Sequence, residues 1–89
     1  MYEVDYYTSE SGDQPVRSFL NSLNPKMKAK AFGRIELLEE FGPELTMPFS
    51  RHLEDGLFEL RVTQGGDIAR VLYFFVVGKR IILTNGFVK

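Results

Sequence analysis

The last third of the chain alternates apolar and polar residues in the pattern typical of β-strands. Three such segments cover residues 56–61, 68–75 and 81–89, and each carries a basic residue. Between the first two lies Gln64-Gly65-Gly66-Asp67, a turn signal that predicts a four-residue loop. The three segments are therefore expected to form an antiparallel meander.

The loop length decides which residues of the first two strands lie opposite each other. If the loop pairs Thr63 with Ile68, Arg61 lies opposite Arg70 on one face, with Glu59 two residues along the strand. A change of one residue in the loop would move Arg70 to the other face. The opposite face of these strands is expected to pack against the core, because three apolar pairs point that way: Val62 with Ala69, Leu60 with Val71 and Phe58 with Tyr73.

The first half of the chain predicts one strand and two helices. Residues 2–7 alternate tyrosine or valine with acids, which predicts a short edge strand. Proline at the first position favours a helix over residues 15–23, and Asn24 followed by Pro25 opens a second helix that runs to Gly42. One apolar stripe of the second helix is expected to face the core: Met27, Ala31, Ile35 and Leu38.

These elements predict an α+β fold in a single domain of residues 1–89: an N-terminal strand, a helical hairpin and a three-stranded antiparallel meander. Pro43 and Pro48 bracket an irregular segment before the meander. Gly33, inside the second helix, either allows close packing or is a harmless surface glycine.

Composition narrows the class of protein. The chain has no cysteine and a single histidine, His52, so it has neither a disulfide framework nor the ligands of a zinc site built on histidine and cysteine. Its longest apolar run, residues 71–77, has seven residues where a membrane span needs about twenty, and its N-terminus lacks the pattern of a signal peptide. We expect a soluble, cytoplasmic protein. The net charge of −1 argues against a generally basic surface for nucleic acid.

Two interpretations of the facing arginines stand side by side. Like charges directly opposite each other are mildly repulsive, so an anion, such as a phosphate group, is one occupant of the space between Arg61 and Arg70. Alternatively, Glu59 neutralises the pair in a surface salt-bridge cluster.

At these residues the chain resembles the RelE/HigB superfamily of bacterial toxins, specifically its phage-derived HigB-like branch. The resemblance covers essentially the whole chain, although each motif alone is weak. The motifs follow one another in this order: Gln14-Pro15, Phe19-Leu20, Leu37-Leu38, Asp55-Gly56-Leu57, Glu59-Leu60-Arg61, Arg70 to Phe74, and Gly86-Phe87 with Lys89.

The resemblance implies the toxin of a type II toxin–antitoxin system, a ribosome-dependent endoribonuclease that cleaves mRNA. Its partners would be mRNA on the ribosome and a cognate antitoxin, often of the helix-turn-helix type, and no metal or other cofactor is implied. Cleavage would proceed by acid–base chemistry at the ribose 2′-OH. The resemblance assigns phosphate contact to Arg70 and a charge near the leaving group to Lys89.

Other site residues are assigned more loosely. Arg61 and Glu59 are further catalytic candidates, and Glu59 and His52 are the two candidates for the general base, because related toxins carry lysines where this chain has Leu57 and Glu59. Four residues are expected to contact RNA: Arg51, His52, Tyr73 and Arg80.

The resemblance also implies a toxin cut off at its last strand, because members of this branch usually continue past Lys89 with a further lysine, a Thr-Pro segment and a C-terminal helix. The alternative function is then a catalytically impaired domain that binds antitoxin or RNA, and the uncovered sheet would allow a homodimer. An unrelated small α+β interaction domain would be favoured if the hairpin register separated Arg61 from Arg70.

Overall fold

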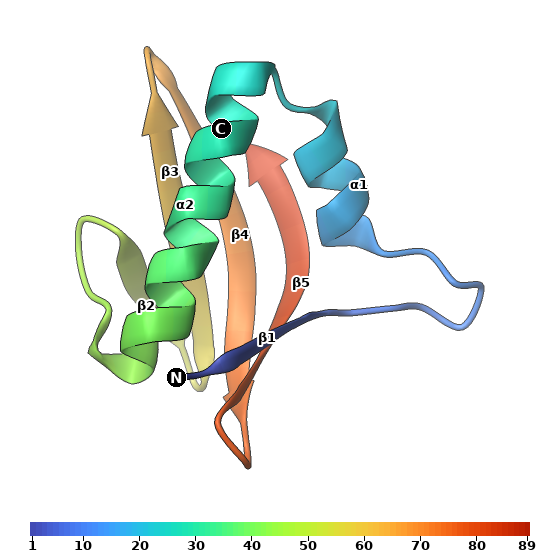
Figure 1. Cartoon of the computed structure of the whole chain (residues 1–89), viewed down its shortest axis with the longest axis vertical. Coiled ribbons are helices and arrows are strands. Elements are labelled where there is room, and N and C mark those ends of the chain that lie inside the picture. The colour runs from blue at the N-terminus through green and yellow to red at the C-terminus, as the bar shows by residue number, and fades with distance from the viewer.

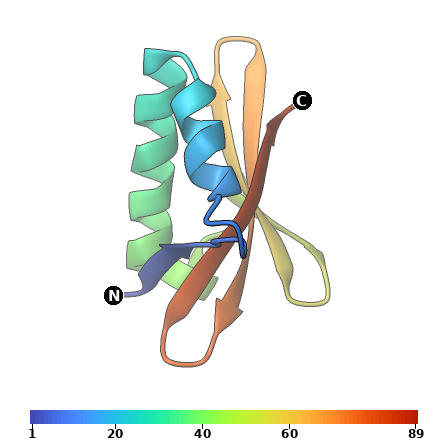
Figure 2. The same cartoon turned by 90° about the vertical axis from the view of Figure 1, so that its right-hand side faces the viewer.

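Five strands form a single sheet in the computed structural model, which describes residues 1–89 (Figure 1). Along the chain the strands are β1 Glu3–Tyr6, β2 Ser50–Glu54, β3 Leu57–Gln64, β4 Asp67–Val76 and β5 Arg80–Val88. Their spatial order is β1-β5-β4-β3-β2; β1 runs parallel to β5, and the other neighbours are antiparallel. Both helices lie on one face of the sheet, and the other face, which we call the outer face, carries no helix (Figure 2).

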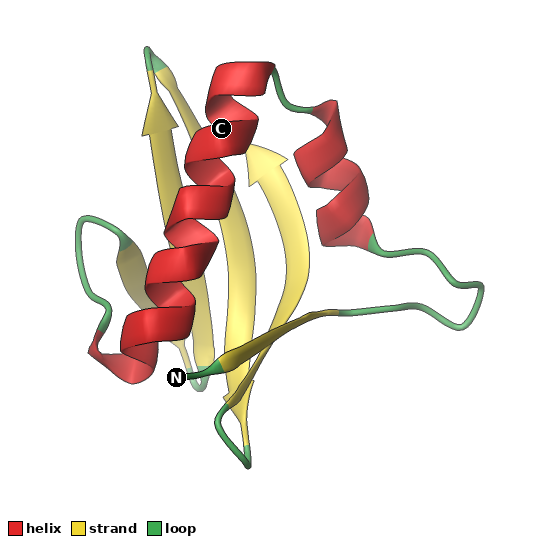
Figure 3. Cartoon of the chain, in the orientation of Figure 1, coloured by secondary structure: helices red, strands yellow, loops and turns green.

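The two helices, α1 Pro15–Ser22 and α2 Pro25–Phe41, begin at the predicted residues and end within one residue of the predicted ends (Figure 3). The Asn24 side chain accepts a hydrogen bond of 2.9 Å from the N–H of Met27, which satisfies a donor that has no partner inside the helix. At the other end Gly42 adopts a φ of 52° and starts a 3₁₀ turn, Gly42–Glu44. That positive φ favours glycine, so the predicted C-terminal cap is confirmed.

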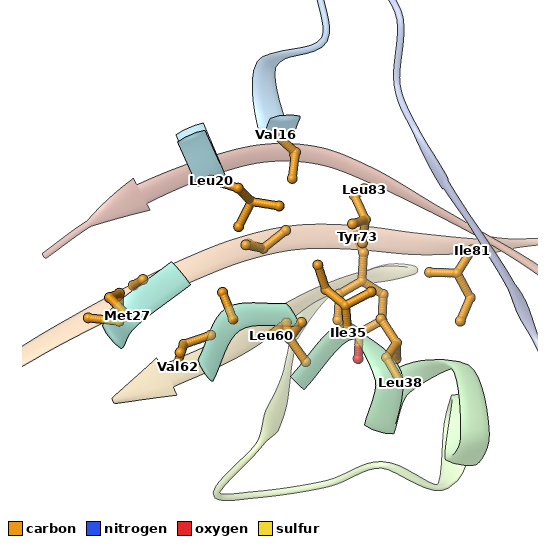
Figure 4. Packing of buried hydrophobic residues seen from close by; sticks show 13 residues of the cluster. Val16, Leu20, Met27, Ile35, Leu38, Leu60, Val62, Tyr73, Ile81 and Leu83 are labelled. Atoms are coloured by element: carbon orange, nitrogen blue, oxygen red, sulfur yellow. The ribbon is translucent and has the colours of Figure 1, made fainter. Parts of the chain in front are cut away.

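The core lies between the helices and the sheet (Figure 4). The four residues of the predicted stripe are the buried residues of α2. From the sheet, the apolar residues of β3 and β4 that were expected to face inward do so. Thirteen residues make up the cluster: Val16, Leu20, Met27, Ala31, Ile35, Leu38, Leu60, Val62, Ala69, Val71, Tyr73, Ile81 and Leu83.

The register of the β3–β4 hairpin is the one that the turn predicts. Arg61 pairs with Arg70 and Leu60 pairs with Val71. The ladder continues one pair further, to Gln64 and Asp67, so the connecting turn is tighter than the predicted four-residue loop. This extra pair leaves the register unchanged, and the two arginines lie together on the outer face.

One strand was missed by the sequence analysis: β2, at residues 50–54, precedes the predicted meander. Four of its five residues are exposed, so the alternation of buried and exposed positions that reveals a strand is absent. Backbone pairing with β3 holds it, beginning with Ser50 opposite Leu60. The order after the helices is therefore four strands, and β2 places Arg51 directly opposite Glu59.

Gly33 proves to be a surface glycine, because a methyl group built at its Cα would meet no atom within 4 Å. We expect Gly33→Ala to raise the free energy of unfolding by up to about 1 kcal/mol, since alanine loses less backbone entropy than glycine in a helix interior. Chemical denaturation of both proteins would measure the difference. A loss of stability would show that α2 needs this glycine for a contact that its surroundings do not reveal.

Candidate functional site

The candidate site is a cluster of charges on the outer face, formed by Arg51, Glu59, Arg61 and Arg70. The odd-numbered residues of β3 and the even-numbered residues of β4 point away from the helices, because Leu60 and Val71 point into the core. Adding β2 brings Arg51 beside them. Three adjacent strands thus bring together on one surface four charges that lie up to nineteen positions apart along the chain.

Glu59 lies beneath the three arginines and is only 2% exposed. Its Oε1 accepts a hydrogen bond of 3.3 Å from Nη1 of Arg70, while its Oε2 is 3.8 Å from Nε of both Arg51 and Arg61. The side chains of Arg61 and Arg70 are 19% and 14% exposed, and that of Arg51 is 50% exposed. Glu59 therefore pairs with both facing arginines, as the second interpretation expects, but it does so as a buried residue and not at the surface.

Glu59 neutralises only part of the cluster. Three guanidinium groups and one carboxylate leave a formal excess of two positive charges. Each guanidinium has five N–H donors, whereas the three groups together make only two hydrogen bonds: the one to Glu59, and a long contact of Arg61 Nη1 with Met47 Sδ at 3.9 Å. Planar donors with spare capacity on an open surface suit a phosphate group.

Phe87 and Lys89 extend this surface along β5. Phe87 lies directly opposite Arg70, on the outer face, and is 42% exposed. The N–H of Lys89 donates a 3.1 Å hydrogen bond to the carbonyl of Ile68, which places the lysine two residues beyond the Arg70–Phe87 pair along β5. The sequence analysis gave Phe87 no role in the site, although its spacing of two residues from Lys89 puts both residues on one face.

His52 and Arg80 lie away from the cluster. His52 is opposite Phe58, with ring centroids 4.9 Å apart, so it shares the helix-bearing side of the sheet rather than the outer face. Arg80 lies at the far end of β5, where its Nη2 is 2.5 Å from Oδ2 of Asp5, and this hydrogen bond is the main cause that raises the pKa of Arg80. Neither residue can share a phosphate with Arg70 in this arrangement.

Tyr73 belongs to the core, and the expectation that it contacts RNA does not fit its 1% exposure. Its hydroxyl forms a buried hydrogen bond with Oγ of Ser50. Burial raises the pKa of the Tyr73 hydroxyl above its ordinary value, and the bond to Ser50 opposes this shift only in part. Tyr73 therefore stays protonated at neutral pH and ties β4 to β2. The conflict was visible in the sequence, since the predicted register already turned Tyr73 inward.

A hollow beside β1, lined by residues that include Asp5, Tyr6, Arg17 and Arg80, lies at the other end of the sheet from the arginines. No group of three His, Asp or Glu side chains converges as metal ligands would. Neither helix is long and apolar enough to cross a bilayer.

The architecture is compatible with a RelE-like fold: a strand, two helices and a mixed sheet with an arginine-bearing open face. Residues 18–89 match the model of the family described as Phage derived protein Gp49-like (DUF891), and the chain belongs to this family. It is a RelE/HigB-like toxin family, so membership places the chain among toxins of toxin–antitoxin systems and implies an antitoxin as its partner. A search of curated proteins finds no match.

Proposed function

We propose that this chain is a HigB-like toxin that cleaves mRNA on the ribosome, and that the outer face binds the RNA. The observation that carries the proposal is the Arg61–Arg70 pair, which sits on an open face with an excess of positive charge in a chain whose net charge is −1. A local group of cations on a rigid sheet favours binding of a polyanion at this one site, whereas a generally basic surface would attract nucleic acid everywhere.

The chemistry that this site supports is metal-independent cleavage next to a 2′-OH. A base removes the 2′-OH proton, the oxygen attacks the adjacent phosphorus, the bond to the 5′ oxygen breaks, and an acid protonates that oxygen. Negative charge develops on the phosphate during attack, and Arg61 and Arg70 would stabilise it. Lys89 would supply positive charge on the side of the departing oxygen.

The position of Glu59 suits pairing with the arginines better than proton transfer to or from the RNA. A general base must come within hydrogen-bonding reach of the proton that it removes. Glu59 is the one of the two candidate bases that lies on this face, but it is covered by the arginines and hydrogen-bonded to Arg70. His52 lies on the other side of the sheet. We therefore assign neither residue to the base.

Phe87 would hold the nucleotide beside the phosphate. Its exposed ring lies opposite Arg70, so a phosphate bound by Arg70 would bring a neighbouring base close to the ring. Stacking of a base on an aromatic side chain contributes about 1 to 3 kcal/mol and requires no particular sequence. This arrangement suits single-stranded message, whose bases are free to leave their neighbours.

The test is to induce the chain in growing bacteria and to map new RNA ends. We expect growth arrest, breaks within translated regions, and relief of both effects when the protein encoded by the neighbouring reading frame is expressed with it. Blocking initiation on a reporter message should protect that message from cleavage. Equal cleavage of translated and untranslated copies would exclude dependence on the ribosome.

A second candidate function is a binding module without cleavage. The observation that favours it is the pairing of Glu59 with all three arginines, which gives the cluster a structural role of its own. Normal growth on induction, intact messages and tight binding of the antitoxin would together identify this function.

A further inference from the structure

The charge cluster holds an anion of its own. Glu59 occupies the position beneath the arginines and is only 2% exposed, although no helix covers this face of the sheet (Figure 2). A buried carboxylate is strongly destabilising unless nearby cations compensate its charge. Here three guanidinium groups do so: that of Arg51 on β2, that of Arg61 on β3 and that of Arg70 on β4.

The contacts within the cluster are loose for so many charges. One of the three ion pairs is a hydrogen bond, at 3.3 Å, and the other two are contacts of 3.8 Å without one. Oε2 of Glu59 and Nε of Arg70 are both buried and make no hydrogen bond within the protein. Glu59 therefore shares its charge among the arginines without saturating the donors of any of them.

We propose that Glu59 is an internal counter-anion that limits the affinity of this site for RNA phosphate. This inference rests on the proposed function, because it concerns the same arginines. A phosphate bound by Arg61 and Arg70 adds a second negative charge to a cluster that already holds one. The two anions repel each other across a few ångströms, and the hydrogen bond of Arg70 to Glu59 competes with the bond that Arg70 would donate to the phosphate.

The consequence is an RNA site that is weak in isolation. Free RNA would not fill it readily, whereas a message already held beside the toxin by another body, such as the ribosome, would be present at a high effective concentration. Because Glu59 weakens the binding of free RNA, the site would bind mainly RNA that another body already holds beside it. This role would explain why a buried acid accompanies the facing pair of arginines.

The experiment measures binding of a short single-stranded RNA whose 2′ oxygens are methylated, so that it cannot be cleaved at them. We expect Glu59→Gln to bind this RNA about tenfold more tightly than the parent, the effect of removing one charge near a bound phosphate. The slope of log K against log salt concentration should steepen by about 0.7, the value for one further phosphate contact in a single strand. Weaker binding by a folded Glu59→Gln would overturn the proposal and show that Glu59 positions the arginines.

Two further variants keep the result interpretable. Glu36→Gln makes the same chemical change at an exposed position of α2, so an equal gain there would attribute the effect to overall charge and overturn the proposal. If Glu59→Gln does not fold, Arg51→Gln with Glu59→Gln restores the excess of two positive charges. This double variant should bind more tightly than Arg51→Gln alone, and equal binding would overturn the proposal. Because the RNA is not cleaved, these outcomes do not depend on whether the chain is an active endoribonuclease.

Discussion

Arg70→Ala will lower the rate of mRNA cleavage at least about a hundredfold, because removing one preorganised donor from a developing oxyanion has effects of that size. Arg70 lies on β4 between β3 and β5, opposite both Arg61 and Phe87. The same change will reduce the free energy of unfolding by about 1 to 3 kcal/mol, since Glu59 is left buried with one hydrogen bond fewer. Cleavage of a translated message and urea denaturation measure the two effects separately.

Arg70→Lys separates charge from geometry. Lysine keeps a cation near Glu59 but lacks the planar fork of donors that grips a phosphate, so stability should recover further than cleavage does. Arg17→Ala is the matched control, because Arg17 lies over the ring of Tyr6, 4.8 Å from its centroid, on the helix side. It should cleave at the parental rate. Full activity in Arg70→Ala would remove the arginine pair from the proposed mechanism.

The sequence predicted the arginine pair because one local feature controls it. A glycine-rich turn in a hairpin fixes the register of both strands, and the register fixes which side chains share a face. An error of one pair in the length of the loop did no harm, since Gln64 and Asp67 close the same ladder. The helix ends were equally local, because Asn24 and Gly42 act within one turn of their own positions.

The sequence could not decide the state of Glu59, because that state depends on a strand it did not predict. Without β2 there is no Arg51 opposite Glu59, and a salt bridge at an exposed position would be the natural expectation. With β2 in place the carboxylate is enclosed on several sides and becomes buried. The two interpretations of the arginines, as an anion site or as a salt-bridge cluster, were therefore offered as alternatives although one cluster can serve both.

His52 and Arg80 show a different limit. Both are polar, exposed residues whose side chains alone give no indication of position, and their partners are set by distant parts of the chain. Arg80 pairs with Asp5, 75 residues away, because β1 joins the sheet beside β5. His52 lies on the helix-bearing side because β2 pairs with β3 in one register rather than the next.

Leu60→Ala will reduce the free energy of unfolding by about 2 to 5 kcal/mol, a large share of the total for a domain of 89 residues. Leu60 is 0% exposed in the centre of β3, so its loss leaves a cavity that the surrounding side chains fill only in part. The midpoint of urea denaturation should fall while its slope stays unchanged, which would show a loss of stability without a change in the surface exposed on unfolding.

Leu72→Ala is the matched comparison, because Leu72 lies on the adjacent strand with its side chain on the outer face. In the monomer that face carries no helix (Figure 2), so Leu72 is only partly buried, and its replacement should cost less stability than that of Leu60. Denaturation at several protein concentrations extends the test. If the Leu72→Ala loss approaches that of Leu60→Ala and grows with concentration, a second copy of the chain covers the outer face. In that case a second copy of the chain and RNA would compete for the surface that carries the arginine cluster, so the dimer would be unable to bind RNA there.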